Sequence, residues 1–270
     1  MQVAEHTIEL AGAPVFYRGA EPQLAPILYL HGAPTSSDDW IPLLEATGGV
    51  APDLVGFGRS SKAANLDYTL AGLGNFIEVL LDHLDLPRVT LVAHDWGAGG
   101  GLVFAQRHRE RVRRLVLVNA LPLLEGFRWH RLARILRRPV IGELAMGATT
   151  RSTLRRTLRR GYADPQALSA TRFDEIWAQF DQGTQRALLR LHRSASEAEL
   201  ARAGARLGTL AMPALVVWGE RDPWLPASLA DTYRGRLPDA RVARIADAGH
   251  WPWLERSEAA ERITEFVEGT

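Results

Sequence analysis

The 270-residue sequence contains no cysteine, which excludes disulfide bonds, thiolate nucleophiles and cysteine-ligated metal sites. Long apolar runs are also missing: no stretch approaches the roughly 20 apolar residues that a membrane-spanning helix needs, and residues 1–10 lack the basic and apolar regions of a signal peptide. The formal net charge is only +1, which does not favour a nucleic-acid partner. We therefore expect a cytoplasmic protein without a membrane span, working as a monomer or homodimer.

Short apolar runs alternate with segments of helical periodicity in the first third and the last quarter of the chain. Strands are expected at residues 27–30, 49–54, 89–93, 115–118, 214–218 and 241–245, a hairpin at 7–10 and 15–18, and helices at 69–84, 97–108 and 253–267. This alternation is typical of a mostly parallel sheet with helices on both faces. Because active sites in such sheets lie at the carboxyl ends of the strands, the turns after the strands are where chemistry is expected.

Residues 121–206 differ from the rest of the chain. They show helical segments without a convincing strand, and their net charge is about +8, against about −7 for the remainder. We predict an α/β core made of residues 1–120 and 207–270, into which 121–206 is inserted as a helical cap segment. Arginines recur at helical spacing in this segment, which most simply indicates a solvated helix face. A helix at a membrane interface and an anion-steering surface are the alternatives.

Asp95 occupies the centre of the segment VAHDWG, between an expected strand and an expected helix. A nucleophile elbow needs small residues around a strained turn, so that the reactive side chain stands exposed above the sheet. Gly97 meets this need, whereas Ala93 stands where glycine is more common. A carboxylate at this position would attack carbon and form an alkyl ester. The alternative is that Asp95 only caps the following helix, because aspartate is a good N-cap residue.

Two further motifs follow later strands of the expected sheet. Asp222 ends the segment WGERD, and His250 lies in the segment AGHW. Taken singly, Asp222 could be a turn residue and His250 a surface histidine. The order nucleophile, acid, histidine nevertheless resembles that of α/β-hydrolases. Since the three residues follow three strands of one sheet, they predict a triad in which Asp222 orients His250 as the base.

The segment HGAP follows the first buried strand and supplies a fourth element. The backbone N–H of Ala33, together with that of Trp96, could form an oxyanion site. The alternative is an ordinary turn. We expect His31, Pro34 and Trp251, which neighbour these motifs, to contact the substrate.

The pieces HGAP, PDLVGFGRS, HDWGAGG, GERD and AGHW, in this order, resemble the epoxide hydrolase and haloalkane dehalogenase branch of the α/β-hydrolases. The resemblance covers residues 27–119 and 213–266 and is weak across the cap segment. It implies the α/β-hydrolase fold with an inserted helical cap, and a small apolar epoxide or haloalkane as substrate. It also implies Asp95 as covalent nucleophile and His250 as the base that activates water, with no cofactor and no metal.

The two chemistries of this branch differ in the leaving group. A halide needs weak N–H donors, for which Trp96 is suited, whereas an epoxide oxygen needs an acid, which in epoxide hydrolases is a pair of cap tyrosines. The cap segment holds one tyrosine, Tyr162, and His192 stands where the resemblance places the second. Both can donate to a developing alkoxide, or both are ordinary cap residues. We rank epoxide hydrolase first, haloalkane dehalogenase second, and a non-catalytic binding protein of the same fold third.

Overall fold

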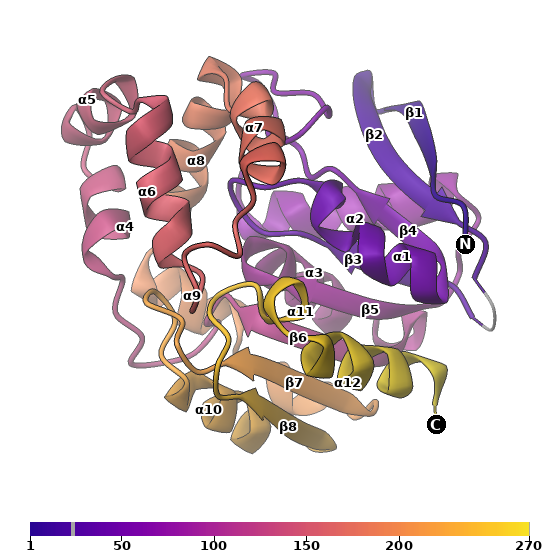
Figure 1. The fold of residues 1–270 in the computed structure, drawn as a ribbon. Coiled ribbons are helices and arrows are strands. Elements are labelled where there is room, and N and C mark those ends of the chain that lie inside the picture. The colour runs from indigo at the N-terminus through magenta and orange to yellow at the C-terminus, as the bar shows by residue number, and fades with distance from the viewer. Residues whose placement is uncertain (23–24, 270) are drawn as a thin grey trace.

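One eight-stranded sheet forms the centre of the computed structural model, which describes residues 1–22 and 25–269 (Figure 1). The strand order is β1-β2-β4-β3-β5-β6-β7-β8, in which β3 to β8 run parallel and the β1–β2 hairpin is antiparallel. The strands are β1 (Ala4–Leu10), β2 (Ala13–Ala20), β3 (Ile27–Leu30), β4 (Gly49–Pro52), β5 (Val89–His94), β6 (Val112–Ala120), β7 (Ala214–Gly219) and β8 (Ala240–Ile245). The predicted mostly parallel sheet is confirmed.

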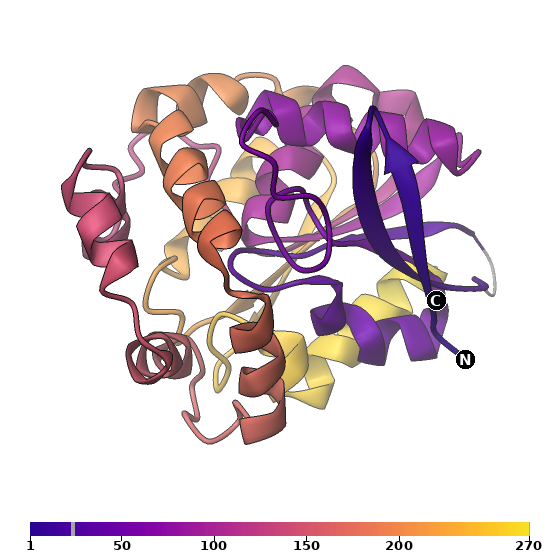
Figure 2. The same cartoon turned by 90° about the horizontal axis from the view of Figure 1, so that it is seen from above.

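Helices cover both faces of the sheet, as the continuous apolar strands predict. Strands β3, β5 and β7 are buried at every position, so they lack the alternation of a half-exposed strand. Helices α1 (Ile41–Thr47) and α12 (Ser257–Glu268) pack together on one face, and α2 (Leu70–His83) and α3 (Asp95–Arg107) pack together on the other (Figure 2). Helix α10 (Ser228–Arg236) packs against β7 and β8.

Helix α3 lies unusually close to its neighbours because glycine occupies its contact positions. A Cβ atom at Gly97 would lie 2.4 Å from the carbonyl oxygen of His31, and one at Gly100 would lie 2.6 Å from the Cβ of Leu73 in α2. Glycine is costly inside a helix, so its presence here indicates a packing requirement. The close approach fixes the start of α3 against the end of β3.

The helices of the cap segment gather beyond the carboxyl ends of the strands, on the side opposite the β1–β2 hairpin in both views (Figures 1 and 2). They are α4 (Arg131–Leu136), α5 (Ile141–Gly147), α6 (Arg151–Arg160), α7 (Ala170–Gln179), α8 (Gln182–Ser194) and α9 (Glu197–Ala203). Residues 121–206 are all described and contain no strand, as predicted. The division into a core and a separate cap domain stays a prediction. Among the described residues, no helix is both long and apolar enough to cross a bilayer.

The end of the chain differs from the single helix predicted at 253–267. Helix α11 (Pro252–Glu255) is followed by Arg256 in an extended conformation, and α12 begins after it. The Glu255 carboxylate accepts hydrogen bonds from the backbone N–H groups of Gly249 (2.8 Å) and Ala163 (2.7 Å), which holds α11 against the preceding loop. Helices α1 and α10 were not predicted from the sequence, nor were three short 3-10 turns, Ser37–Trp40 (η1), Arg109–Arg111 (η2) and Leu207–Thr209 (η3).

Candidate active site

Asp95 stands at the junction of β5 and α3 with a φ of +45°, in the left-handed region that non-glycine residues rarely adopt. Such strain is the property that a nucleophile elbow requires. The backbone N–H of Ala33 donates to Oδ2 of Asp95 at 3.2 Å. A Cβ atom at Gly32 would lie 2.7 Å from the Cβ of Asp95, so only glycine leaves room for the carboxylate beside this turn.

The Asp95 carboxyl is buried, and this burial sets its protonation. Burial raises the pKa of Asp95 to about 6, although the charge of His250 and the backbone N–H groups of Ala33 and Trp96 lower it. The carboxylate is therefore still mostly ionised at neutral pH while having little contact with water.

His250 and Asp222 form a buried pair at the ends of the last two strands. Nδ1 of His250 donates to Oδ2 of Asp222 at 2.6 Å. Burial alone would lower the pKa of His250, but the charge and the hydrogen bond of Asp222, helped by Asp95, raise it above its ordinary value. Because Nδ1 is engaged, Nε2 is the nitrogen that can exchange a proton in the cavity.

Asp222 is itself held by three further donors. Its Oδ1 accepts hydrogen bonds from the backbone N–H groups of Trp224 (2.8 Å) and Leu225 (3.1 Å), and its Oδ2 accepts one from Nδ2 of Asn119 (2.8 Å). Oδ1 of Asn119 accepts from the backbone N–H of Gly219 at 2.9 Å, which ties the ends of β6 and β7 together. Asn119 thus positions the acid. Its place directly after a predicted strand was the only sequence signal for this role.

Two buried histidines, His31 and His94, connect the loops around the predicted triad and do not line the cavity. Nδ1–H of His31 donates to the carbonyl of Gly32 (2.7 Å), and its Nε2 accepts from the backbone N–H of Leu54 (2.8 Å). His31 was expected to contact substrate, but both its nitrogens are bonded to backbone and it does not line the cavity. Nε2 of His94 donates to the carbonyl oxygen of His250 at 3.0 Å, and burial holds the pKa of His94 well below its usual value.

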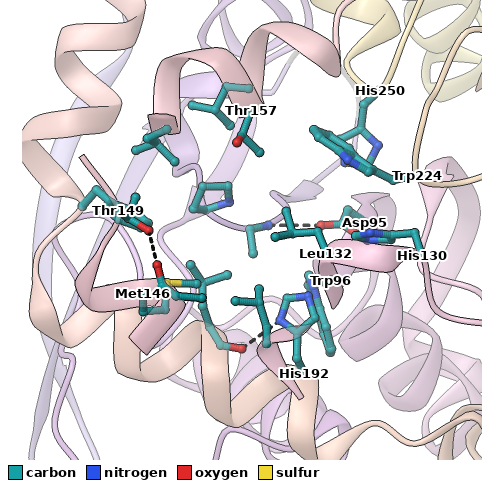
Figure 3. A pocket seen from close by; sticks show the side chains of 18 of the residues that line it. Asp95, Trp96, His130, Leu132, Met146, Thr149, Thr157, His192, Trp224 and His250 are labelled. Atoms are coloured by element: carbon teal, nitrogen blue, oxygen red, sulfur yellow. Dashed lines mark hydrogen bonds between the residues drawn. The ribbon is translucent and has the colours of Figure 1, made fainter. Parts of the chain in front are cut away.

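A cavity of about 320 Å³ lies above Asp95, between the strand ends and the cap helices (Figure 3). Apart from Asp95 and Ala33, its residues with polar groups are Trp96, Trp129, His130, Thr149, Thr153, Thr157, His192, Trp224, His250 and Trp251, and the rest, including Pro34, are apolar. Such a lining suits a small apolar molecule. In the described part of the chain, no cluster of histidine and acidic side chains has the arrangement of a metal site.

The donor pair predicted from Tyr162 and His192 is not formed. Tyr162 does not line the cavity, because its ring stacks on Trp251 with the ring centroids 5.0 Å apart. His192 does line it, but its Nδ1–H donates to the carbonyl oxygen of Leu188 at 2.8 Å. Burial lowers the pKa of His192 to about 4, so at neutral pH its Nε2 is an acceptor and not a donor.

His130 is a cavity residue to which the sequence assigned no role. It caps the start of α4, where its Nδ1 accepts a hydrogen bond from the backbone N–H of Ala133 at 3.4 Å. Burial lowers the pKa of His130 to about 4, so the ring is neutral and its hydrogen sits on Nε2. Trp96 also lines the cavity, and its indole N–H makes no hydrogen bond within residues 1–22 and 25–269. The cavity therefore offers N–H donors near Asp95, but no phenol.

The chain belongs to the α/β hydrolase fold family, whose model matches residues 25–257. It is 44% identical over 93 residues to a haloalkane dehalogenase of Agrobacterium fabrum, a match that covers 33% of this chain and 30% of that protein. The chain therefore aligns with less than a third of this relative's length.

Solved structures resemble the chain over nearly its whole length. An epoxide hydrolase, CorEH, superposes with a TM-score of 0.86 at 20% identity, covering 99% of both chains. The haloalkane dehalogenase DbeA of Bradyrhizobium elkani USDA94 superposes with a TM-score of 0.85 at 23% identity, covering 99% of this chain and 98% of that chain. At these identities the likeness shows the fold alone. The protein is therefore a member of the α/β hydrolase fold family that shares its overall fold with both of these enzymes.

Proposed function

We propose that this protein hydrolyses a bond to an sp3 carbon through a covalent alkyl ester on Asp95. The observation that carries the proposal is the hydrogen bond from the Ala33 N–H to Oδ2 of Asp95 at 3.2 Å, beside the His250–Asp222 pair. A donor on Oδ2 leaves Oδ1 free to attack. The same N–H of Ala33 would stabilise the negative charge that develops on Oδ2 when the ester is cleaved.

In the first step, Oδ1 of Asp95 forms a bond to the substrate carbon while the bond to the leaving group breaks and that group departs with the electron pair. Trp96 and His130 line the cavity, and their N–H groups can stabilise the departing anion. The mostly apolar lining excludes water from this step, which strengthens both hydrogen bonds.

In the second step, Nε2 of His250 takes a proton from water, and the resulting hydroxide adds to the carboxyl carbon of Asp95. The negative charge on Oδ2 is held by the Ala33 N–H. Collapse of this intermediate expels the alcohol oxygen, which takes the proton from His250, and the new carboxylic acid returns its proton to solvent. Asp222 stabilises the transient imidazolium and keeps its orientation.

The leaving group that the cavity supports best is a halide, so we propose a haloalkane dehalogenase. A halide is stable as an anion and needs only N–H donors, whereas an alkoxide needs a proton from an acid such as a phenol. No tyrosine of the described chain lines the cavity. We therefore reverse the order of the two candidates that the sequence favoured. The 44% identity to a haloalkane dehalogenase over 93 residues supports the same choice.

Epoxide hydrolysis is the second candidate, and one observation favours it. Nε2–H of His130 can donate a hydrogen bond to an epoxide oxygen as well as to a halide. A neutral imidazole is a weaker acid than a phenol, so ring opening by this donor would be slow.

A paired assay separates the two candidates. The protein is incubated with a short bromoalkane, followed by bromide release, and with styrene oxide, followed by diol formation. We expect bromide release and little diol. Diol without bromide would restore epoxide hydrolysis as the first candidate, and neither product would favour a non-catalytic binding protein.

A single-turnover reaction in heavy-oxygen water tests the covalent step. Heavy oxygen is expected in the Asp95 carboxylate, detected by mass spectrometry of the peptide, and not in the alcohol. Asp95→Ala is the control and should give no turnover while keeping its circular dichroism spectrum. Label found first in the alcohol would contradict the ester intermediate, because it would mean that water attacks the substrate directly.

A further inference from the structure

Large exposed apolar side chains concentrate on one part of the cap segment. Leu132, Val140, Ile141 and Leu144 have 39%, 68%, 47% and 67% of their surface exposed. Elsewhere in the described chain, only Met1 (40%) and Val79 (44%) are large apolar residues exposed to a similar degree. Clustered apolar side chains on a surface mark an interaction site, whereas scattered ones do not.

The same part of the cap segment surrounds the mouth of the cavity. Most residues that line the cavity are buried or half-buried, and the three that are exposed are Leu132, Ala148 and Thr153. Leu132 lies on α4, Ala148 is the residue that follows α5, and Thr153 lies on α6. The cavity therefore opens to the outside between these three helices.

Helix α5 carries an apolar stripe that leads into this mouth. Ile141, Leu144, Ala145 and Ala148 are spaced i, i+3, i+4 and i+7, so they share one helix face. Ala145 and Ala148 line the cavity, and Ile141 and Leu144 continue the stripe outward into solvent.

Helix α6 presents arginines on the other side of the mouth. Thr153, Arg156, Thr157 and Arg160 have the same spacing, and the two threonines line the cavity, so Arg156 and Arg160 flank its opening. With Arg155 and Arg159 they also line a separate hollow on the outer surface of α6. None of these four arginines is ion-paired with any residue that the structure describes.

We propose that the cavity mouth docks on the surface of a lipid bilayer that contains anionic lipids. The docking face comprises the exposed apolar residues Leu132, Val140, Ile141 and Leu144 and the exposed arginines Arg156 and Arg160 that flank the mouth. Apolar side chains beside unpaired arginines match the acyl chains and phosphate groups of such a surface. The net charge of about +8 on residues 121–206, against about −7 elsewhere, orients this face towards a negative surface. An apolar substrate would then enter the cavity directly from the membrane.

Sedimentation with vesicles tests this docking. The protein is spun with vesicles of phosphatidylcholine alone and of phosphatidylcholine mixed with phosphatidylglycerol. Binding is expected to the mixed vesicles and to weaken with added salt. Leu144→Glu should lower the partition coefficient by about tenfold, and Arg156→Gln by about fivefold. Val79→Glu, which places the same charge on an exposed apolar site of α2, is the matched control and should bind as the native protein does.

The variants also separate this proposal from the proposed catalytic function. Leu144→Glu and Arg156→Gln should keep the native circular dichroism spectrum and, if the haloalkane assay works, the native rate on a water-soluble bromoalkane. Failure of the native protein to bind mixed vesicles overturns the proposal, as does an equal loss in Val79→Glu. If Leu144→Glu instead converts a dimer to a monomer in analytical ultracentrifugation, with no vesicle binding by the native protein, the face is a contact between two copies of this chain.

Discussion

The cavity has two walls: a core wall, which carries Asp95, Asp222 and His250 at the strand ends, and a cap wall, which carries His130 and His192 of the cap segment. The two walls hold their polar side chains in different ways. On the core wall, Asp222 accepts four hydrogen bonds, and Asp95 and His250 each have a partner contributed by another loop. On the cap wall, His130 and His192 each bond only to the backbone of their own helix and leave the second nitrogen to the cavity. The proposed reaction centre is therefore already ordered without substrate, whereas the two cap histidines each keep one nitrogen that a substrate could use.

The attachment of the cap segment to the core is also uneven. Arg172 on α7 binds the buried Asp39 at 2.5 Å and Asp38 at 3.5 Å. Burial alone would raise the pKa of Asp38, but Arg59, Arg18 and Arg172 hold it well below its usual value. Charges that are this well paired anchor α7, whereas α4 to α6 contribute the exposed arginines and the open mouth. The ion-paired helix α7 holds the cap segment beside the core, and the end of α6 is held there by the backbone hydrogen bond from His250 N–H to the carbonyl oxygen of Gly161 (2.6 Å).

The largest expected difference between the two walls is in the kcat of variants that lose a histidine from each of them. His250→Phe removes the base, so kcat should fall by about 10³- to 10⁴-fold and the alkyl ester on Asp95 should accumulate. His192→Phe, the matched change on the cap wall, should alter kcat by less than about threefold because the ring contributes packing and no proton. Steady-state kinetics and intact-protein mass spectrometry measure both effects. Similar losses in the two variants would remove the distinction between the walls.

A stability measurement tests how much the buried, ionised carboxylate of Asp95 lowers the free energy of unfolding. The pKa of Asp95 in the folded protein is raised to about 6, above its unfolded value of about 3.9, so ionised Asp95 destabilises the fold. This cost is absent below the unfolded value, grows as pH rises towards 6, and is complete above it. Asp95→Asn should therefore raise the free energy of unfolding at pH 7 by up to about 3 kcal/mol.

Urea denaturation of the native protein and of Asp95→Asn, at neutral pH and near pH 4, measures this difference. The gain should be largest at neutral pH and should shrink at the lower value. A variant that is less stable than the native protein at neutral pH would mean that the ionised carboxylate is well solvated, and the burial argument would fail.

Most residues of the core wall could be predicted from the sequence, because the carboxyl ends of parallel strands lie at the same edge of the sheet. Continuous apolar runs marked β3, β5 and β7, and a parallel sheet brings Ala33, Asp95 and Asp222 to one edge wherever the loops allow it. The supporting contact from Asn119 could not be predicted, because it depends on a side chain reaching from the end of β6 to the loop after β7.

The cap wall was predicted poorly for a related reason. Which way a helical or loop residue faces depends on how the helix is rotated against its neighbours, and sequence spacing within one helix does not fix this rotation. Tyr162 follows α6 and packs on Trp251, so it lies outside the cavity, while His130 reaches the cavity by capping α4. The composition of the cap segment showed its helices and its charge, but it did not show which polar groups meet the substrate.

The pH dependence of kcat/KM tests whether the groups that titrate between pH 5 and pH 7, Asp95 and His250, lie on the core wall. At pH 5, Asp95 is mostly protonated because burial raises its pKa to about 6, and His250 is protonated because Asp222 raises its pKa. A fall of at least about tenfold from pH 7 to pH 5 is expected. Because burial lowers the pKa of both His130 and His192 to about 4, neither changes charge in this range. His130→Phe should therefore keep the same profile, and a shifted profile in that variant would place a titrating group on the cap wall.

The leaving-group role of His130 has a smaller expected effect. His130→Phe removes one N–H donor while keeping an aromatic ring, so kcat should fall about fivefold on a chloroalkane. The loss should be smaller on an iodoalkane, because iodide leaves more readily and depends less on hydrogen bonding. The ratio of the two rates in native and variant protein is the measurement. An equal loss on both substrates would indicate that the ring only shapes the cavity.

Tyr162→Phe has the smallest expected effect and tests whether the Tyr162 hydroxyl takes part in turnover. The ring stays stacked on Trp251, and the hydroxyl has no hydrogen-bond partner anywhere in residues 1–22 and 25–269, so bromide release should change by less than about twofold. Tyr162→Ala is the informative comparison, because loss of the stacked ring frees Trp251 at the cavity wall and should raise KM more than it lowers kcat. If Tyr162→Phe abolished diol formation from styrene oxide, the phenol would have to turn into the cavity during turnover. The cap wall would then carry an acid after all, and epoxide opening would again be the better candidate.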